Sequence, residues 1–307
     1  MGRESLTDLR DLDDTQIWPA PRSDAQERGI PAQLLLIDCR DEVGLVHKIT
    51  GVLVRAGLSI VSNHEYVDPT LRHFYMRTAF LGATSSEAML RELRELLPAG
   101  ANIRVASTAP RRIVVLATKE PHCLGDLLLR HAEGDIPAKI EAVVSNHATL
   151  ERLVRRFDVP FHHVPHEGMD RVAHERAIQT VLDRYDPEYL VLAKFMRVLS
   201  SAFVSRYAGR FINIHHSFLP AFVGARPYQQ AFERGVKIIG ATAHIVTDDL
   251  DTGPIIAQDV RPVTHAHTAA DMARAGRDVE KIVLARALTL LLEERVFLSG
   301  DRAVVFE

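Results

Sequence analysis

Asn213 and His215 are the first two side chains of this chain whose types and spacing suit chemistry. They stand in a run of strand-forming residues at 211–215, and residues 217–220 are a turn that ends the strand. Because side chains two residues apart on a strand share a face, the amide and the imidazole point the same way. Open α/β sheets bind ligands at the carboxyl ends of their strands, so the pair marks a candidate site. Taken alone, the pair is better explained by a buried amide and a buried imidazole that satisfy each other.

A second polar segment follows about thirty residues later. Residues 240–246 predict another strand, and residues 247–254 predict a polar turn closed by a Gly-Pro pair. His244 and Asp251 belong to this segment, so a second imidazole and a carboxylate join the first pair. A spacing that extends over both segments is a more specific signal than either segment alone.

Together the two segments resemble the formyltransferase family that uses 10-formyltetrahydrofolate. The resemblance rests on Asn-x-His, then Ser-x-Leu-Pro, then a histidine with six residues before Asp-x-Gly-Pro. That family includes glycinamide ribonucleotide transformylase, methionyl-tRNA formyltransferase and formyltetrahydrofolate deformylase. The resemblance implies a small-molecule folate substrate, no separate cofactor, no metal, and a catalytic set of Asn213, His215 and Asp251.

The loop at residues 118–126 favours the deformylases within this family. Transformylases carry a Gly-rich loop at this place to hold a nucleotide phosphate, and phosphate binding at a helix start needs open backbone N–H groups. Here the run is TKEPHCLGD, in which Glu120 puts an acid where an anion should bind. We therefore expect hydrolysis of 10-formyltetrahydrofolate to tetrahydrofolate and formate, which would supply formate for purine biosynthesis and balance one-carbon pools. The alternatives are transfer of the formyl group to a small amine of the glycinamide ribonucleotide type and a non-catalytic folate or amino-acid sensor.

In the expected reaction, water attacks the formyl carbon while Asn213 and His215 donate hydrogen bonds to the oxyanion. Asp251 would act as the general base or set the charge of His215, and the two would exchange roles to protonate the leaving nitrogen. His244 would hold Asp251 in place. His216 stands where the family's transformylases usually have proline, and strand alternation puts it on the face opposite His215, so we expect a supporting role at most.

The run KFMRVL at residues 194–199 follows a continuous apolar strand at 189–193. In the family this loop wraps the pterin of the folate. The resemblance therefore implies an apolar wall and a cation that holds the loop or meets the folate glutamate. The wall would come from Met196, Val198 and Leu199, and the cation would be Arg197. The alternative is that Met196 and Leu199 are ordinary core residues.

Length and composition set the frame for these motifs. A chain of 307 residues suggests two domains, and 47% hydrophobic with 25% charged residues is typical of a globular protein. The formal net charge of −3 and the lack of a long apolar run indicate neither a nucleic-acid partner nor a membrane partner. With Cys39 and Cys123 far apart and a charged amino terminus unlike a signal peptide, we expect a cytoplasmic protein. The cluster His162, His163 and His166 lacks the spacing and partners of a zinc site.

Residues 1–31 are polar and predict an extended arm, and residues 32–108 predict a separate ferredoxin-like domain of β-α-β-β-α-β order. With DEVGLV at residues 41–46, this domain resembles the ACT family, whose members often bind amino acids and pair their sheets between subunits. The resemblance implies a homo-oligomer and an effector such as glycine or methionine near Asp41, Gly44 and Asn63. These three residues are equally explained as caps and turns.

Residues 109–307 predict the catalytic domain, after a linker at 109–112. Strands alternate with helices, which is typical of a doubly wound, Rossmann-like α/β sheet. We expect helices near residues 148–156 and 169–185, and a final helix from about 268 to about 298. The predicted fold class is therefore α/β, with an N-terminal ferredoxin-like ACT domain followed by a Rossmann-like formyltransferase domain.

Overall fold

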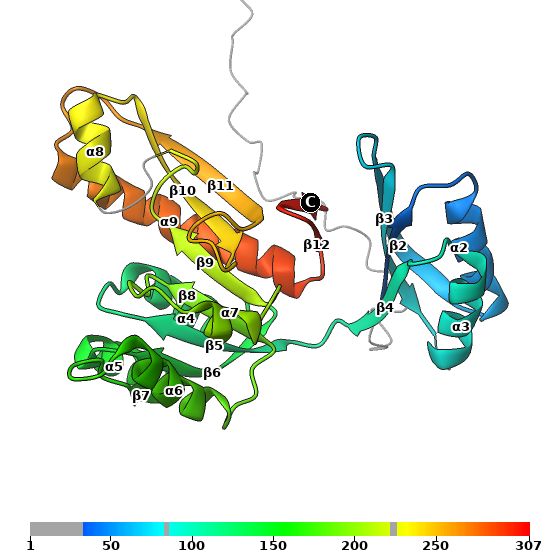
Figure 1. Ribbon diagram of the computed structural model, residues 1–307, viewed down its shortest axis with the longest axis horizontal. Coiled ribbons are helices and arrows are strands. Elements are labelled where there is room, and N and C mark those ends of the chain that lie inside the picture. The colour runs from blue at the N-terminus through cyan, green and yellow to red at the C-terminus, as the bar shows by residue number, and fades with distance from the viewer. Residues whose placement is uncertain (1–32, 83–85, 222–225) are drawn as a thin grey trace, which may run out of the picture. The chain divides into compact units, whose positions relative to one another are not determined.

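The computed structural model describes residues 33–82, 86–221 and 226–307 (Figure 1). The chain divides into two compact units between Ser107 and Thr108. The amino-terminal arm predicted for residues 1–31 lies outside the described residues. No helix in the described part of the chain is long and apolar enough to cross a membrane.

The first unit is a four-stranded antiparallel sheet with two helices on one face. The strand order is β2-β3-β1-β4. The elements are β1 (Gln33–Arg40), α2 (Leu45–Arg55), β2 (Ser59–Asp68), β3 (His73–Leu81), α3 (Ser86–Leu96) and β4 (Asn102–Ser107). Alternate residues of β1, Leu35 and Ile37, face a core that also contains Ile49 and Leu53 of α2 and Leu93 of α3. The predicted ferredoxin-like order is confirmed.

The second unit is built on a seven-stranded sheet of order β11-β10-β9-β8-β5-β6-β7. Its strands are β5 (Arg111–Ala117), β6 (Ala138–Ser145), β7 (Phe161–His163), β8 (Tyr189–Ala193), β9 (Phe211–His215), β10 (Ile238–Ile245) and β11 (Ile255–Pro262). Strands β5 to β9 pair in parallel, whereas β10 pairs antiparallel with both β9 and β11. The predicted Rossmann-like α/β domain is confirmed, with an antiparallel edge.

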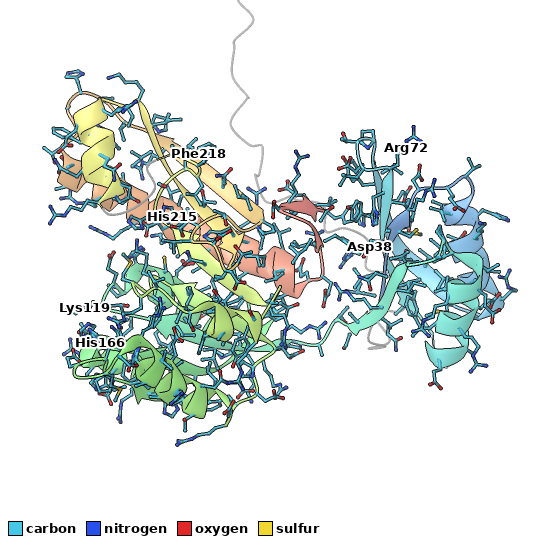
Figure 2. The ribbon with its side chains drawn as sticks, in the orientation of Figure 1. Asp38, Arg72, Lys119, His166, His215 and Phe218 are labelled. Carbon is cyan, nitrogen blue, oxygen red and sulfur yellow. The ribbon has the colours of Figure 1, made fainter. Side chains whose placement is uncertain are left out.

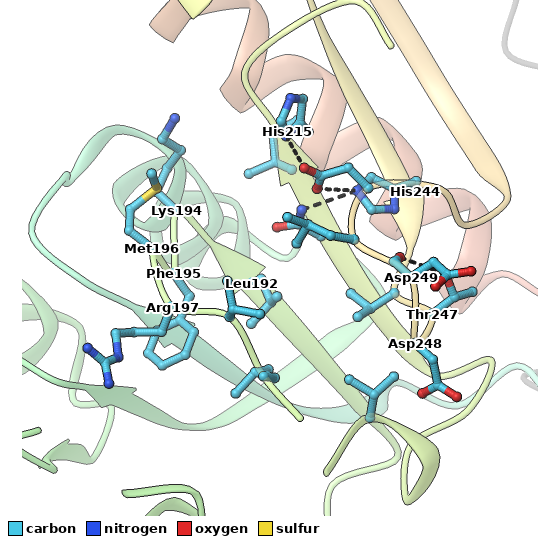
Figure 3. A pocket seen from close by; sticks show the side chains of 18 of the residues that line it. Leu192, Lys194, Phe195, Met196, Arg197, His215, His244, Thr247, Asp248 and Asp249 are labelled. Atoms are coloured by element: carbon cyan, nitrogen blue, oxygen red, sulfur yellow. Dashed lines mark hydrogen bonds and ion pairs between the residues drawn. The ribbon is translucent and has the colours of Figure 1, made fainter. Parts of the chain in front are cut away.

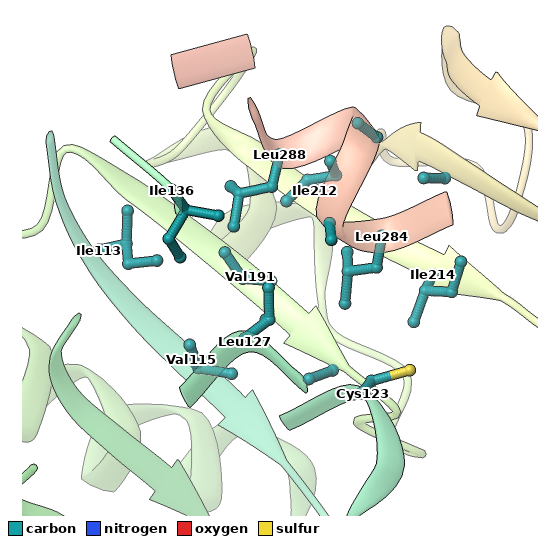
Figure 4. Packing of buried hydrophobic residues seen from close by; sticks show 14 of the residues in the cluster. Ile113, Val115, Cys123, Leu127, Ile136, Val191, Ile212, Ile214, Leu284 and Leu288 are labelled. Carbon is teal, nitrogen blue, oxygen red and sulfur yellow. The ribbon is translucent and has the colours of Figure 1, made fainter. Parts of the chain in front are cut away.

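Helices cover both faces of this sheet, because its central strands are apolar on both sides. The helices are α4 (His122–Glu133), α5 (Glu151–Val154), α6 (Arg171–Leu182), α7 (Ser201–Ser205), α8 (Pro227–Arg234) and α9 (Ala269–Leu292). Ile113 and Val115 of β5 pack with Leu127 of α4 and Leu284 of α9 (Figure 4). Val114 and Leu116 face the other way, toward α6 and α7. The central strands of the sheet are therefore buried between helices on both faces.

The carboxyl terminus differs from the prediction of one helix to residue 298. Helix α9 ends at Leu292, and β12 (Val296–Ser299) and β13 (Arg302–Val305) form a hairpin. Glu294, at φ 57°, leaves the helical region, and Gly300, at φ 58°, supplies the left-handed residue that the tight turn needs. The helix predicted near 148–156 is also interrupted, because 3₁₀ turns (Ala148–Leu150 and Arg155–Phe157) flank the single turn of α5.

Candidate active site

Pairing between β9 and β10 brings the two predicted segments together. Asn213 lies directly opposite His244, and His215, the last residue of β9, lies opposite Thr242. Residues opposite each other on antiparallel strands share a face, so the amide and the His244 ring meet. Asn213 Nδ2 lies 3.2 Å from His244 Nε2. The prediction that the two segments form neighbouring strands is confirmed.

Asp251 reaches the same point from the loop between β10 and β11. Its carboxylate lies 3.2 Å from His215 Nδ1 through Oδ2 and 3.6 Å from His244 Nε2 through Oδ1. Asp251 itself has φ 56°, a left-handed conformation that aspartate tolerates better than most residues. One carboxylate therefore contacts both imidazoles of the site.

The protonation of this cluster follows from its partners. Burial alone would raise the pKa of Asp251, but the imidazoles of His215 and His244 outweigh it and hold that pKa well below its usual range. His244 Nδ1 lies 2.9 Å from the carbonyl oxygen of Ile245, which can only accept, so Nδ1 carries a hydrogen, and Nε2 of the same ring accepts from the Asn213 amide. Asp251 is thus a carboxylate that accepts from His215 Nδ1.

His215 Nε2 is buried and has no hydrogen-bond partner among the described residues. Its ring is oriented by Asp251 through the other nitrogen. A neutral imidazole in this tautomer presents Nε2 as an acceptor, and an imidazolium presents it as a donor. The site therefore offers one uncommitted imidazole nitrogen next to one amide.

These side chains stand on the wall of a cavity of ≈ 360 Å³ (Figure 3). That size suits a small organic ligand. Nine of the 19 residues that line the cavity are apolar, and they come from β8 and the loop after it, from α7, from β9 and from the loop after β10. They are Leu192, Phe195, Met196, Val198, Leu199, Val204, Ile214, Val246 and Leu250.

The structure places all four predicted folate residues on this cavity. Arg197 lines it beside Met196, Val198 and Leu199. Met196 is 58% exposed, so it is not an ordinary core residue as the alternative supposed, whereas Leu199 is partly buried and packs against the core of this unit. The backbone N–H of Met196 donates to Thr118 Oγ1 at 3.1 Å, which fixes this loop to the one after β5.

Sequence reasoning missed the opposite wall and one charged residue. Residues 246–250 line the cavity as a loop, and Lys194 lines it at the end of β8. The six-residue interval between His244 and Asp251 was the available signal for the loop. If both side chains belong to one site, the residues between them must form a loop at the edge of that site. Nothing in the sequence pattern singled out Lys194.

The prediction that His216 faces away from His215 is wrong. Strand β9 ends at His215, so strand alternation does not extend to the next residue. The two ring centroids are 5.2 Å apart, and both rings line the same cavity. Burial, with a smaller contribution from the Lys194 ammonium, lowers the pKa of His216 to about 4, so its imidazole is neutral near neutral pH.

Behind His216 lies a buried polar network centred on Glu280 of α9. Its Oε2 is 2.8 Å from His122 Nε2 and 3.1 Å from Lys194 Nζ, and Tyr228 donates to Oε1 at 2.6 Å. Burial would raise the pKa of Glu280, but His122, Lys194 and Tyr228 together lower it to about 2. Gly276, one turn earlier on α9, makes room for the phenol, because an added Cβ would lie 2.0 Å from Tyr228 Oη.

Within the part of the chain that the structure describes, two groups of side chains have spacing that could hold a metal ion. Ligand atoms of His122, Cys123 and Glu280 lie within 4.8 Å of one another, but the Lys194 ammonium already occupies Glu280 and would repel a cation. The second group is His147, His166 and Glu167, which has the same spread. Burial and the Lys119 charge lower the pKa of His147. Lys119 and His166 lie in the same region of this unit (Figure 2).

The predicted histidine cluster at residues 162–166 separates in the structure. His162 Nε2 lies 2.7 Å from the Tyr185 hydroxyl, whereas His166 Nδ1 lies 3.3 Å from Asn146 Nδ2. The two rings therefore take different partners and do not form one cluster.

The three candidate effector residues of the first unit do not converge within that unit. Asn63 and Leu35 both pair with Thr78, and Asp41, one residue beyond the end of β1, lies six residues after Leu35, roughly 20 Å away at the rise of a strand. Asn63 Oδ1 accepts from Thr78, and its Nδ2 donates to Glu65, both at 2.5 Å. Gly44 has φ 87° and precedes α2, a backbone position that glycine adopts freely.

Comparison with known proteins adds an independent finding. The Formyl transferase family matches residues 111–288, and the ACT domain family matches residues 33–98. The chain is 51% identical over 276 residues to a formyltetrahydrofolate deformylase of Haemophilus influenzae, covering 90% of this chain and 99% of that protein. It is 52% identical over 267 residues to the protein of the same name from Escherichia coli K12, covering 87% and 95%. The crystal structure of a formyltetrahydrofolate deformylase from Pseudomonas syringae superposes with a TM-score of 0.87 at 37% identity, covering 92% of this chain and 97% of that one.

Proposed function

The chain belongs to the formyltetrahydrofolate deformylase family, and we propose that it hydrolyses 10-formyltetrahydrofolate to tetrahydrofolate and formate. The family resemblance predicted from the sequence is confirmed. The observation that carries the proposal is the convergence of Asn213, His215, His244 and Asp251 on the wall of one apolar cavity.

Asn213 supports stabilisation of the tetrahedral oxyanion. Its amide nitrogen has two hydrogens, and one is directed at His244 Nε2. The second is available to an oxygen that becomes negatively charged during attack. A donor already held in place costs no reorganisation when that charge develops, which is why such groups are effective in catalysis.

Asp251 and His215 support the proton transfers, in roles that the depressed pKa of Asp251 helps to assign. A carboxylate with so low a pKa is a weak base, so we assign Asp251 the role of orienting His215 rather than of removing the proton from water itself. His215 Nε2 then accepts a proton from water as its oxygen bonds to the formyl carbon. The same proton passes to the leaving nitrogen as the C–N bond breaks, and the other proton of the water stays on formic acid, which departs with tetrahydrofolate and ionises to formate in solvent.

His244 holds the Asn213 amide and the Asp251 carboxylate in place in this scheme. It accepts from Asn213 and contacts Asp251, and it is 2% exposed. Folate would bind with its ring between the apolar walls of the cavity and with Arg197 near its carboxylates. His216 supports the His215 ring.

We also propose, on the strength of the ACT domain, that an amino acid such as glycine or methionine regulates the enzyme and that the chain works as a homo-oligomer. Its two cysteines are both free, which supports a reducing, cytoplasmic compartment. Titration of glycine and of methionine against formate release tests the effector, and light scattering tests the assembly. No change in rate with either amino acid would leave the first unit as a scaffold.

Formate release with and without an amine acceptor tests the proposed reaction against its alternatives. Release that needs no acceptor supports the hydrolase, dependence on glycinamide or a related amine supports the transferase, and folate binding without turnover supports the sensor. The transferase is disfavoured by the loop after β5, where Glu120 contacts His122 at 3.5 Å and the neighbouring residues support the network around Glu280.

A matched set of variants locates the reaction. Asn213→Ala, His215→Ala and Asp251→Ala should each lose turnover while they keep binding folate, as measured by fluorescence titration. His267→Ala serves as the control, because this histidine lies on an exposed loop and pairs with Thr264. Full turnover in the three site variants would show that the chemistry occurs elsewhere.

A further inference from the structure

The polar network around Glu280 is deeply buried, and the proton transfers assigned to Asn213, His215 and Asp251 do not use it. Glu280 is fully buried and Lys194 is 5% exposed. Taking such charges out of water is costly, and apolar residues of similar volume often stabilise a fold as well or better. Stability alone therefore does not account for a lysine and a glutamate at these positions.

The backbone at Lys194 makes the same point independently. This residue has φ 60°, in the left-handed region that glycine enters freely and that longer side chains adopt uncommonly. Strained backbone of this kind collects at functional sites, where the surrounding structure holds it. Both the burial of its charge and the conformation of its backbone disfavour a lysine here. These costs indicate a functional role for the Lys194 ammonium.

His216 connects this network to the catalytic residues. Lys194 lines the cavity together with His215 and His216. The His216 ring centroid lies 5.2 Å from that of His215 and 6.2 Å from that of Tyr228. One imidazole therefore separates the buried network from the catalytic imidazole.

The charges around His216 come from every element packed against it. Lys194 follows β8 and disfavours protonation of the ring, as does His215 of β9. Glu280 of α9 and Asp251 of the β10–β11 loop favour it. Tyr228 of α8 adds its ring, and His122 of α4 acts through Glu280.

We propose that Lys194, held by Glu280 on the cavity wall that His215 and His216 also line, is a positioning residue of the hydrolysis that acts on His216, the imidazole beside His215. An uncharged His216 can accept a hydrogen bond from the attacking water, whereas a protonated one would repel His215 as it gains a proton. This inference rests on the proposed hydrolysis, which it deepens.

Three variants of the full chain test the inference: Lys194→Met, Glu280→Gln and the double substitution. Each single change leaves a buried partner unbalanced, so both should lower Tm. The double variant holds no buried net charge, so its Tm should return toward that of the native chain. Its kcat for formate release should nevertheless remain at least about tenfold low, because the cation beside His216 is missing.

The pH profile of kcat/KM, measured between about pH 3 and about pH 9 so that it spans the lowered pKa of His216, separates positioning from packing. Lys194→Met removes a charge that opposes protonation of His216, so its acid limb should move to higher pH. Glu280→Gln removes a charge that favours protonation, so its acid limb should not move upward. A purely structural role would move neither limb.

Glu294→Gln is the matched control, since Glu294 is also a buried glutamate, paired with Arg111 at 2.8 Å. It lies fourteen residues beyond Glu280, roughly 20 Å at the rise of a helix, and it should lower Tm without changing the pH profile. Recovery of native kcat and pH profile in the double variant would overturn the inference, as would an unchanged Lys194→Met. A native chain that releases no formate would instead refute the proposed function.

Discussion

The two units of this chain show how differently predicted site residues can fare in a fold. In the second unit, four residues from two sequence segments meet at 3.2–3.6 Å on one cavity wall. In the first unit, Asp41 lies one residue beyond the end of β1, six residues after the β1 position that lies in line with Asn63, and Asn63 uses its side chain within the sheet. In the second unit, pairing between β9 and β10 places Asn213 against His244. In the first unit, no strand pairing within the described residues joins Asp41 to Asn63, and only the position of a loop suggested that they share a site.

Removal of the charge on Asp251 should give the largest effect and is the sharpest way to break this comparison. Asp251→Asn keeps the shape of the side chain but allows the amide to donate where the carboxylate accepted from His215 Nδ1. The tautomer of His215 would be lost, and kcat should fall by about 10²–10⁴. Steady-state formate release measures the loss, and a fall of less than tenfold would remove Asp251 from the mechanism.

Asn213→Ala should give the next largest effect. Loss of one preorganised donor to an oxyanion typically costs about 10²–10³ in kcat. The side chain is partly buried and lines the cavity, so folate should still bind with similar affinity. A rise in KM with unchanged kcat would mean that the amide binds folate and takes no part in the transition state.

Acid stability extends the comparison to energetics. The pKa of Glu280 is lowered from 4.5 to about 2, which at about 1.4 kcal/mol per pKa unit corresponds to on the order of 3 kcal/mol. Because the folded pKa is the lower one, this stability is present above about pH 4.5 and is lost as the pH falls toward about 2.

Urea unfolding at a series of pH values measures this loss. The double variant Lys194→Met/Glu280→Gln should show a smaller dependence on pH over that window. In the first unit the corresponding pair, His73 and Asp38, is 33% and 25% exposed and is more screened by solvent. An equal pH dependence in the native chain and the double variant would contradict the linkage assigned to Glu280.

Asn63→Ala should have the smallest effect on rate. Thr78 is fully buried and donates to Asn63, so the substitution should destabilise the first unit by about 1–3 kcal/mol. Formate release should stay within about twofold of the native rate. A changed response to glycine or methionine, with unchanged stability, would restore Asn63 as an effector residue.

The elements that carry the site could be predicted from the sequence because each has a strong local signal. Apolar runs mark β8 and β9, and the His244–Asp251 interval marks the loop that returns to the site. His216 was misplaced because strand alternation was extended beyond the residue at which the strand ends.

Residues whose role depends on distant partners left no such signal. Lys194 is one position after a predictable strand, but its partner Glu280 is eighty-six residues away on a helix whose pattern is simply amphipathic. The terminal hairpin was missed for a related reason, since Val296 and Phe297 continue the apolar period of α9. Tertiary contacts, and not local propensity, decide both.

Gly276 gives one part of this architecture a practical consequence. A glycine inside a long helix costs about 1 kcal/mol relative to alanine, so a programme of thermostabilisation would choose it early for replacement. Yet a methyl group there would collide with the phenol of Tyr228, which donates to Glu280 and whose ring lies 6.2 Å from that of His216. Gly276 makes the helix less stable at this turn but leaves room for the Tyr228 ring. A Gly276→Ala substitution made to stabilise the helix should therefore displace Tyr228 from Glu280 and disturb catalysis.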